Sequence, residues 1–156
     1  MLFSYLVSLV LVVAMSLFGV YVSAAKPLWY LDVPSIIMVF LPTFVLCAGD
    51  YGWKGIGTAF SASFGKKEKT EKELAQADAV SIALGRYAWY AAVFGTCIGI
   101  IAILASLRET PDPNRLGPNV AVSLICFFYA IMFNFMLITP MRNRIAQKRE
   151  SKDGAR

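Results

Sequence analysis

The sequence predicts an all-α integral membrane protein with four transmembrane helices. Of its 156 residues, 58% are hydrophobic and 16% are charged, whereas soluble domains carry about 45–50% apolar and about 25% charged residues. The apolar residues gather in four runs, and a helix needs about 20 such residues to cross a bilayer. No Asp, Glu, Lys, Arg or His lies within any of the four runs.

The first two runs cover residues 2–25 and 33–48. The first ends near a Val-Ser-Ala triplet at 22–24 that resembles a signal-peptide cleavage site. Its start carries no basic residue, however, and it is longer than the apolar core of about 7–15 residues of a signal peptide. We therefore expect it to stay in the protein as a span. The second run is short and lies between Asp32 and Asp50.

The third and fourth runs cover residues 87–107 and 120–141. Thr70 and Glu73 have the spacing of a capping box, in which each residue satisfies the other's backbone N–H at a helix start. Neither Gly nor Pro interrupts the chain from there until Gly85. We expect one helix to begin near Thr70 and to continue into the third span, so that this helix extends into the cytoplasm.

The segments between and after the spans are expected to be less regular. The proline-rich stretch 108–119 is predicted to be an extended loop, because proline restricts the backbone and removes a donor. The charged tail, residues 142–156, is predicted to fray. Residues 53–64 carry Trp and Phe at helical spacing, which predicts an amphipathic helix at the membrane interface.

The basic residues predict the orientation in the membrane. Six Lys or Arg residues lie in the segment 49–86 and six in the tail 142–156, but only Lys26, Arg108 and Arg115 lie in the two opposite loops. Cytoplasmic segments carry the excess of basic residues, so both termini should be cytoplasmic and residues 1–156 should form a single four-span membrane domain. The net charge of +5 therefore indicates anionic lipid as a partner rather than nucleic acid.

The composition disfavours enzyme chemistry and metal binding. The chain has no histidine, and its three cysteines, Cys47, Cys97 and Cys126, lie far apart inside apolar runs. They match no zinc or redox spacing, and we interpret them as small packing residues. No nucleophile–base pair can be assembled from the spans. We expect no enzymatic activity, no metal and no cofactor.

The third span carries a stripe of small residues at steps of three and four: Ala88, Ala92, Gly95, Gly99 and Ala102. Small residues at this spacing let two helix backbones approach closely in lipid. Thr96 lies beside the stripe. Two interpretations of its hydroxyl stay open: a hydrogen bond back to the carbonyl one turn earlier, or a place on the lining of a path through the membrane.

The fourth span has a similar edge, made of Ser123, Cys126 or Phe127, Ala130 and Asn134. An asparagine in hydrocarbon needs a polar partner, so Asn134 either joins two helices or lines a path. Pro140 lies near the cytoplasmic end of the span, where it is predicted to end the helix or to form a hinge.

Three segments resemble the MotA/TolQ/ExbB proton-channel family in the order in which they occur. DVPSIIMVFLPT at 32–43 resembles the opening of the second span of flagellar MotA. GRYAWYAAVFGTCIGIIAIL at 85–104 resembles the third-span signature, with its Gly-Thr pair. LGPNVAVSLICFFYAIMFNFMLITPMRNRI at 116–145 resembles the fourth-span signature, with its Gly-Pro entry and closing Pro.

The resemblance implies a ring, typically of five copies, around a single-span partner of the MotB/ExbD/TolR type in a bacterial inner membrane. In that family the partner supplies a protonatable Asp, and the third and fourth spans line the proton path. The resemblance places Thr96 beside this Asp and matches Pro140 to the fourth-span proline. Asp32, Pro34 and Ser35 match the second-span motif and are expected to be structural. Only about forty residues separate spans two and three, so we expect a short relative without MotA's large cytoplasmic domain.

Two functional hypotheses follow. In the first, the chain is a ring-forming subunit of a complex driven by the proton-motive force, and Thr96, Ser123, Cys126 and Asn134 line the proton path. In the second, it is a non-conducting membrane scaffold that uses the same helices for assembly. A small solute transporter is disfavoured, because the sequence has neither inverted repeats nor charges within the spans.

Overall fold

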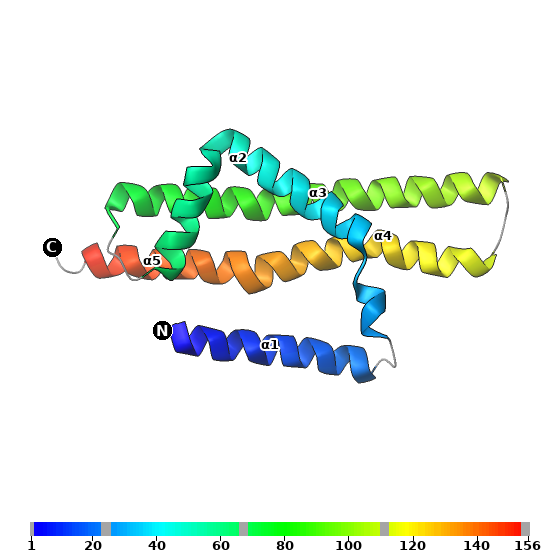
Figure 1. Cartoon of the computed structure of the whole chain (residues 1–156), viewed down its shortest axis with the longest axis horizontal. Coiled ribbons are helices and arrows are strands. Elements are labelled where there is room, and N and C mark those ends of the chain that lie inside the picture. Colours follow the sequence, from blue (N-terminus) through cyan, green and yellow to red (C-terminus); the bar gives the residue numbers. More distant parts are fainter. Residues whose placement is uncertain (1, 23–25, 66–68, 110–112, 154–156) are drawn as a thin grey trace. The chain divides into compact units, whose positions relative to one another are not determined.

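All regular secondary structure in the described parts of the chain is helical, which confirms the predicted all-α class (Figure 1). The computed structural model describes residues 2–22, 26–65, 69–109 and 113–153. Three helical segments are long and apolar enough to cross a membrane: Leu28–Phe64, Glu71–Ala105 and Ser123–Lys152. The chain divides into two compact units, Met1–Val33 and Pro34–Arg156.

The first unit consists of helix α1, Leu2–Val22, and a short 3₁₀ helix, η1, Pro27–Tyr30. The 21 residues of α1 reach the length of about 20 residues that a span requires. Its sequence is apolar on all sides, and the Ser16 hydroxyl donates to the carbonyl of Val12 at 2.8 Å within the same helix. A helix of this kind has no polar face that would favour water.

Helix α2, Val33–Phe64, starts the second unit and extends well past the predicted limit of residue 48. It bends at Gly52, whose φ of 71° and ψ of 159° lie outside the helical region. Glycine adopts this positive φ at little steric cost. Beyond the bend the helix resumes, as the aromatic spacing predicted, but Ile56 and Ala59 are buried within the protein.

Helix α3, Glu71–Glu109, starts where the sequence predicted. The Thr70 backbone N–H donates to Glu73 Oε2 at 2.8 Å, and the Glu73 N–H donates to Thr70 Oγ1 at 3.3 Å. Two backbone donors at the helix start are satisfied by this reciprocal pair, as in a capping box. With 39 residues, α3 is much longer than the span of about 20 residues that a bilayer needs.

Helix α4, Pro113–Phe133, is followed directly by a π-helical turn, η2, Asn134–Ile138, and by helix α5, Thr139–Asp153. The predicted extended loop at 108–119 is therefore wrong for residues 108–109, which end α3, and for residues 113–119, which begin α4; residues 110–112 lie outside the described residues. Pro113 occupies the first helical position, where a missing N–H costs no hydrogen bond. The predicted fraying of the tail is also wrong up to Asp153, because α5 is held by contacts with α2 and α3 described below.

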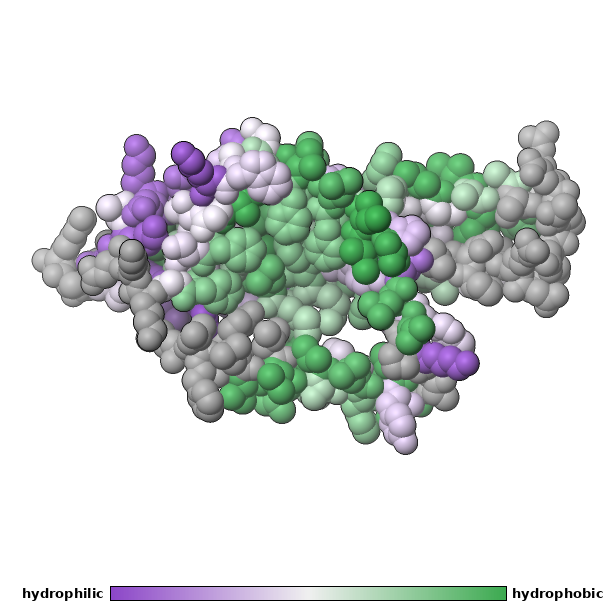
Figure 2. All heavy atoms as spheres, viewed as in Figure 1, coloured by the Kyte–Doolittle hydropathy of each residue, from purple (hydrophilic) through white to green (hydrophobic). Residues whose placement is uncertain are grey.

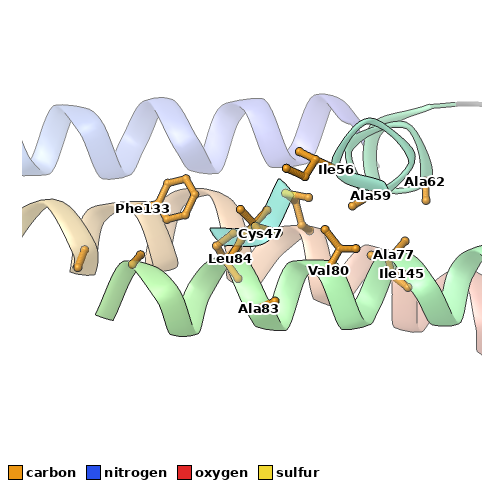
Figure 3. Close-up of a cluster of buried hydrophobic side chains, with 14 of the residues drawn as sticks. Cys47, Ile56, Ala59, Ala62, Ala77, Val80, Ala83, Leu84, Phe133 and Ile145 are labelled. Carbon is orange, nitrogen blue, oxygen red and sulfur yellow. The ribbon is translucent and has the colours of Figure 1, made fainter. Parts of the chain in front are cut away.

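In the second unit, α3 runs antiparallel to α4 and α5, and α2 lies against this pair (Figure 1). Val80 and Leu84 of α3 point toward Cys47 and Ile56 of α2 in the buried cluster (Figure 3). Hydrophilic residues gather around the beginning of α3 and the end of α5, whereas most of the rest of the unit's surface in this view is apolar (Figure 2). This division is typical of a helical membrane protein that has one end of its helices in water.

Candidate functional site

Thr96 lies buried between α3 and α4, with 5% of its surface exposed. Its hydroxyl donates to the backbone carbonyl of Ser123 on α4 at 2.9 Å. The bond back to the preceding turn of α3, one of the two interpretations left open for this hydroxyl, is therefore wrong. Thr43 shows the expected pattern instead, since its hydroxyl donates to the Val39 carbonyl of its own helix at 2.6 Å. Thr96 thus differs from an ordinary membrane-helix threonine in joining two helices.

Two glycines on α3 bring α4 close enough for this bond. A Cβ atom added to Gly99 would lie 2.4 Å from Ser123 Oγ and 3.0 Å from Ser123 Cβ. A Cβ atom added to Gly95 would lie 3.0 Å from Cys126 Sγ. Because these positions lack side chains, the two backbones approach to the distance that small-residue packing in lipid permits. The predicted packing role of Gly95 and Gly99 is in line with these distances.

The remaining members of the small-residue stripe divide between the inside and the outside of the second unit. Ala88 and Ala92 are fully buried, as packing positions should be. Ala102 is exposed. On α4, Ser123 and Cys126 are buried, with 5% and 4% of their surfaces exposed. A single contact therefore joins α3 to the α4–η2 stretch, and we call it the α3–α4 seam. It runs from Gly85–Asn134 through Gly95–Cys126 to Thr96–Ser123 and Gly99–Ser123.

Asn134 closes the other end of the seam. Its side-chain Nδ2 donates to the carbonyl of Gly85 on α3 at 3.3 Å and to the carbonyl of Ala130 on its own helix at 2.9 Å. A Cβ atom added to Gly85 would lie 2.5 Å from Asn134 Oδ1. Asn134 therefore joins two helices, one of its two predicted roles, and again a glycine makes room for the contact.

Pro140 does not end the helix, so that part of its prediction is wrong. Proline has no N–H and so cannot bond to the carbonyl four residues earlier. The chain adjusts in the preceding turn, where the Thr139 N–H bonds to the Asn134 carbonyl across five residues. Such π turns are rare in proteins overall, and those that do occur are often found at functional sites. The turn begins at Asn134, the residue that contacts α3, and the alternative interpretation of Pro140 as a hinge stays a prediction.

The second-span motif lies at the start of α2. Asp32 directly precedes the first residue of the helix, and Pro34 is in its first turn, where a missing N–H is tolerated. Ser35 is buried, with 5% of its surface exposed. These places fit the expected structural role, which stays a prediction.

Polar contacts at the charged end of the unit were not anticipated from the sequence. The Tyr87 hydroxyl donates to the carboxylate of Asp50 on α2. Lys148 of α5 donates through Nζ to the carbonyls of Ala62 and Gly65 at 2.5 and 2.9 Å, where α2 ends. In the sequence, Asp50 stands out only as the charged residue just after the second apolar run. Nothing but its charge distinguishes Lys148 in the sequence.

Ion pairs join α5 to the first turns of α3. Arg149 Nε lies 2.7 Å from Glu71 Oε1, and Arg142 Nε lies 3.3 Å from Asp78 Oδ1. Burial, followed by the positive charge of Arg144, lowers the pKa of Lys148, because both disfavour the charged amine. These contacts hold α5 as a helix, although its own residues are mostly polar.

The seam can pass or accept a hydrogen bond but cannot hold a charge. A threonine hydroxyl donates one proton and accepts two hydrogen bonds, so Thr96 retains acceptor capacity after donating to Ser123. No Asp, Glu, Lys, Arg or His stands in the predicted third and fourth spans, whereas ion and proton carriers within membranes normally need such a group. All buried side-chain nitrogen and oxygen atoms in the described part of the chain have a hydrogen-bond partner.

The fold and the seam define a helical membrane protein with a hydroxyl and an amide held between closely packed helices. The profile of the MotA/TolQ/ExbB proton channel family matches residues 58–154, which include all of α3, the seam, the π turn and α5. The chain belongs to this family. The family is one of channels rather than of enzymes.

Two curated relatives match parts of the chain. The chain is 31% identical to the uncharacterized protein YtxD of Bacillus subtilis over 68 residues, which are 44% of this chain and 24% of YtxD. It is 26% identical to the chemotaxis protein PomA of Vibrio alginolyticus over 83 residues, which are 53% of this chain and 32% of PomA. The matched regions thus make up less than a third of either relative.

Proposed function

We propose that this chain is the ring-forming subunit of an energy-coupling complex driven by the proton-motive force. In this proposal α3 and α4 line the proton path around a single-span partner of the MotB/ExbD/TolR type, which supplies the protonatable Asp. The observation that carries the proposal is Thr96, a buried hydroxyl between two helices of a proton-channel family member. The seam has no Asp, Glu, Lys, Arg or His of its own, so a carboxylate on the path has to come from another chain.

The proposed topology has four spans with both termini in the cytoplasm of a bacterium. Helix α1 supplies the first span, and the three longer apolar segments supply the others. The excess of basic residues in 49–86 and 142–156 supports this orientation. In this arrangement the first turns of α3, together with α5 and the end of α2, form a short cytoplasmic bundle.

Assembly into a ring, with five copies as the expected number, is supported by the outer face of α3. Tyr90, Phe94, Ile101 and Leu104 each expose more than 60% of their surfaces. Such side chains need apolar neighbours, which are lipid tails or another copy of the chain. Native mass spectrometry of the complex in detergent is the direct measurement of the number of copies.

The experiment that tests the proposal measures proton flux. The chain is reconstituted into liposomes with the single-span protein encoded beside it, and a trapped pH-sensitive dye reports flux driven by a potassium diffusion potential. A hydrogen bond to an ionised group contributes about 1.5–3 kcal/mol, so losing it at the rate-limiting step should slow flux about tenfold to a hundredfold. Thr96→Val should therefore lower flux by this factor.

Thr43→Val is the matched control, because Thr43 is equally buried but bonds only within its own helix. It should leave flux close to that of the parent, whereas replacing the partner's intramembrane Asp by Asn should abolish flux. Parent-level flux in both Thr96→Val and the partner variant would end the proposal.

The second candidate is a non-conducting scaffold. The observation that favours it is that Thr96 and Asn134 both donate to backbone carbonyls within the protomer, as interhelical joints would. For a scaffold, Thr96→Val lowers the free energy of unfolding and the yield of the complex, and no flux depends on the partner's Asp.

A further inference from the structure

The α3–α4 seam contains an aromatic contact between its two polar ends. Along α3 the contacts follow the order Gly85, Trp89, Gly95–Thr96 and Gly99. Their partners follow the order Asn134 of η2, then Phe127, Cys126 and Ser123 of α4. Residue numbers rise along α3 while those of the partners fall, so these contacts lie one after another along an antiparallel pair of helices. The Trp89–Phe127 contact therefore separates the Thr96–Ser123 hydrogen bond from the Asn134–Gly85 hydrogen bond.

The geometry of the aromatic pair places it across the seam. The ring centroids of Trp89 and Phe127 lie 6.2 Å apart with an interplanar angle of 55°, within the range of a favourable aromatic contact. Trp89 stands seven residues before Thr96, which puts both on nearly the same face of α3 and about 10 Å apart along the axis. Phe127 directly follows Cys126, which packs against Gly95.

We propose that Trp89 and Phe127 form the apolar barrier that keeps water from joining the two polar ends of the α3–α4 seam. Hydrophobic constrictions in channels gate by excluding water, and a proton needs water or polar side chains to move. Trp89 is 40% exposed, so the indole reaches the free side of α3, where a neighbouring helix can displace it. The barrier prevents protons from leaking when the partner is not in position. The part of this proposal that concerns protons rests on the proposed function.

A competing role for Trp89 is that of an interfacial aromatic, which anchors a helix at the level of the lipid headgroups. That role requires no ring partner on α4 and predicts no effect on atoms deeper in the seam. The native thiol of Cys126 distinguishes the two roles. It is buried, with 4% of its surface exposed, at the level of Thr96.

The first test measures the reaction of Cys126 with a small, permanently charged methanethiosulfonate in liposomes that contain the full chain. The exposed Cys97 is replaced by Ala, and Cys47, which is fully buried, stays as an internal reporter of general loosening. Trp89→Ala and Phe127→Leu should each raise the rate at Cys126 several-fold, and Trp89→Phe should raise it much less. Peptide mass spectrometry separates the two thiols.

Ile82→Ala is the matched control, since Ile82 lies two turns before Trp89 on α3 and is equally exposed, at 40%. It should leave Cys126 as unreactive as in the parent. Equal rates at Cys126 in Trp89→Ala, Ile82→Ala and the parent would overturn the barrier. Equal gains at Cys47 and Cys126 would overturn it too, because they would indicate loss of packing throughout the unit.

The second test measures passive proton leak of the complex with its single-span partner, with no potential applied. Trp89→Ala should leak several-fold faster than the parent and Ile82→Ala. If driven flux depends on Thr96 and on the partner's Asp but leak is unchanged by Trp89→Ala, the barrier is wrong and the proposed function stands. If Cys126 becomes reactive in Trp89→Ala while no variant conducts, the water barrier stands and the proposed function is wrong.

Discussion

Helix α3 makes two different kinds of contact along its length. In its apolar half it meets α4 through glycines, one hydroxyl and one amide, and all the donors end on backbone carbonyls. In its first turns it meets α5 through charged side chains, including the Arg149–Glu71 and Arg142–Asp78 pairs. The same helix is thus held by close packing at one end and by charge at the other.

The difference follows from the solvent expected around each end. In hydrocarbon the hydrophobic effect does not drive helices together, so packing and hydrogen bonds must do so. At the charged end, where α3 begins and α5 ends, water screens charges, and exposed ion pairs contribute about 0–1 kcal/mol each. Small volume changes should therefore disrupt the seam, whereas the charged end should tolerate single substitutions and respond to pH.

The largest effect is expected from Gly99→Ala. The new Cβ would lie 2.4 Å from Ser123 Oγ and 3.0 Å from Ser123 Cβ, and overpacking of this kind costs about 1–3 kcal/mol. The free energy of unfolding in mixed detergent micelles should fall by this amount, and the Thr96–Ser123 hydrogen bond should lengthen as α4 moves away.

Gly49→Ala is the control for this substitution. Gly49 lies in α2, and a Cβ atom there meets nothing within 4 Å. Alanine in a helix interior is more favourable than glycine by about 0.5–1 kcal/mol, so this variant should be slightly more stable than the parent. If Gly99→Ala and Gly49→Ala shift stability in the same direction, close packing does not hold the seam.

A smaller effect is expected from Lys148→Met at the charged end of the unit. The substitution keeps most of the aliphatic side chain but removes the donor to the Ala62 and Gly65 carbonyls. A net loss of about 1 kcal/mol in the free energy of unfolding is expected, with earlier proteolysis where α2 ends. Lys72→Met, at an exposed position of α3, should change stability by no more than about 0.5 kcal/mol. Equal losses in both variants would show that the carbonyl contacts do not hold α5.

Local features of the fold could be predicted from the sequence, because their causes lie within a few residues. The capping box needs only Thr70, Glu73 and the turn between them. The close approach at Gly95 and Gly99 follows from the missing side chains. The motifs of the third and fourth spans resembled a family whose profile matches residues 58–154.

Features that depend on distance between helices could not be predicted. A threonine hydroxyl can reach the carbonyl of its own helix or that of a neighbour, and Thr43 and Thr96 make opposite choices. Thr96 bonds to Ser123 because Gly99 brings α4 near, which periodicity alone does not reveal. Likewise the sequence of α5 has the composition of a polar tail. Its helix could not be predicted, because it is stabilised by contacts with α2 and with α3, which are far away in sequence.

The smallest effect is expected from the titration of Glu73, which changes stability with pH. The backbone N–H of Thr70, and then the side chain of Lys69, hold the pKa of Glu73 below its ordinary value. A lowered carboxyl pKa adds stability that is complete above the ordinary value of about 4.3 and is lost as pH falls through the folded-state pKa. Glu73→Gln keeps a capping side chain but cannot titrate. Its unfolding free energy should therefore fall less steeply than that of the parent below about pH 5.

The same titration should leave the seam unaffected, because neither Thr96 nor Asn134 changes charge. Thr96→Val should therefore shift the stability of the parent by a constant amount at every pH, whereas Glu73→Gln should change the slope. Guanidinium-free mixed-micelle unfolding at several pH values measures both. A parent curve parallel to that of Glu73→Gln would show that the cap does not couple to folding, and a slope change in Thr96→Val would mean that the seam senses a titrating group.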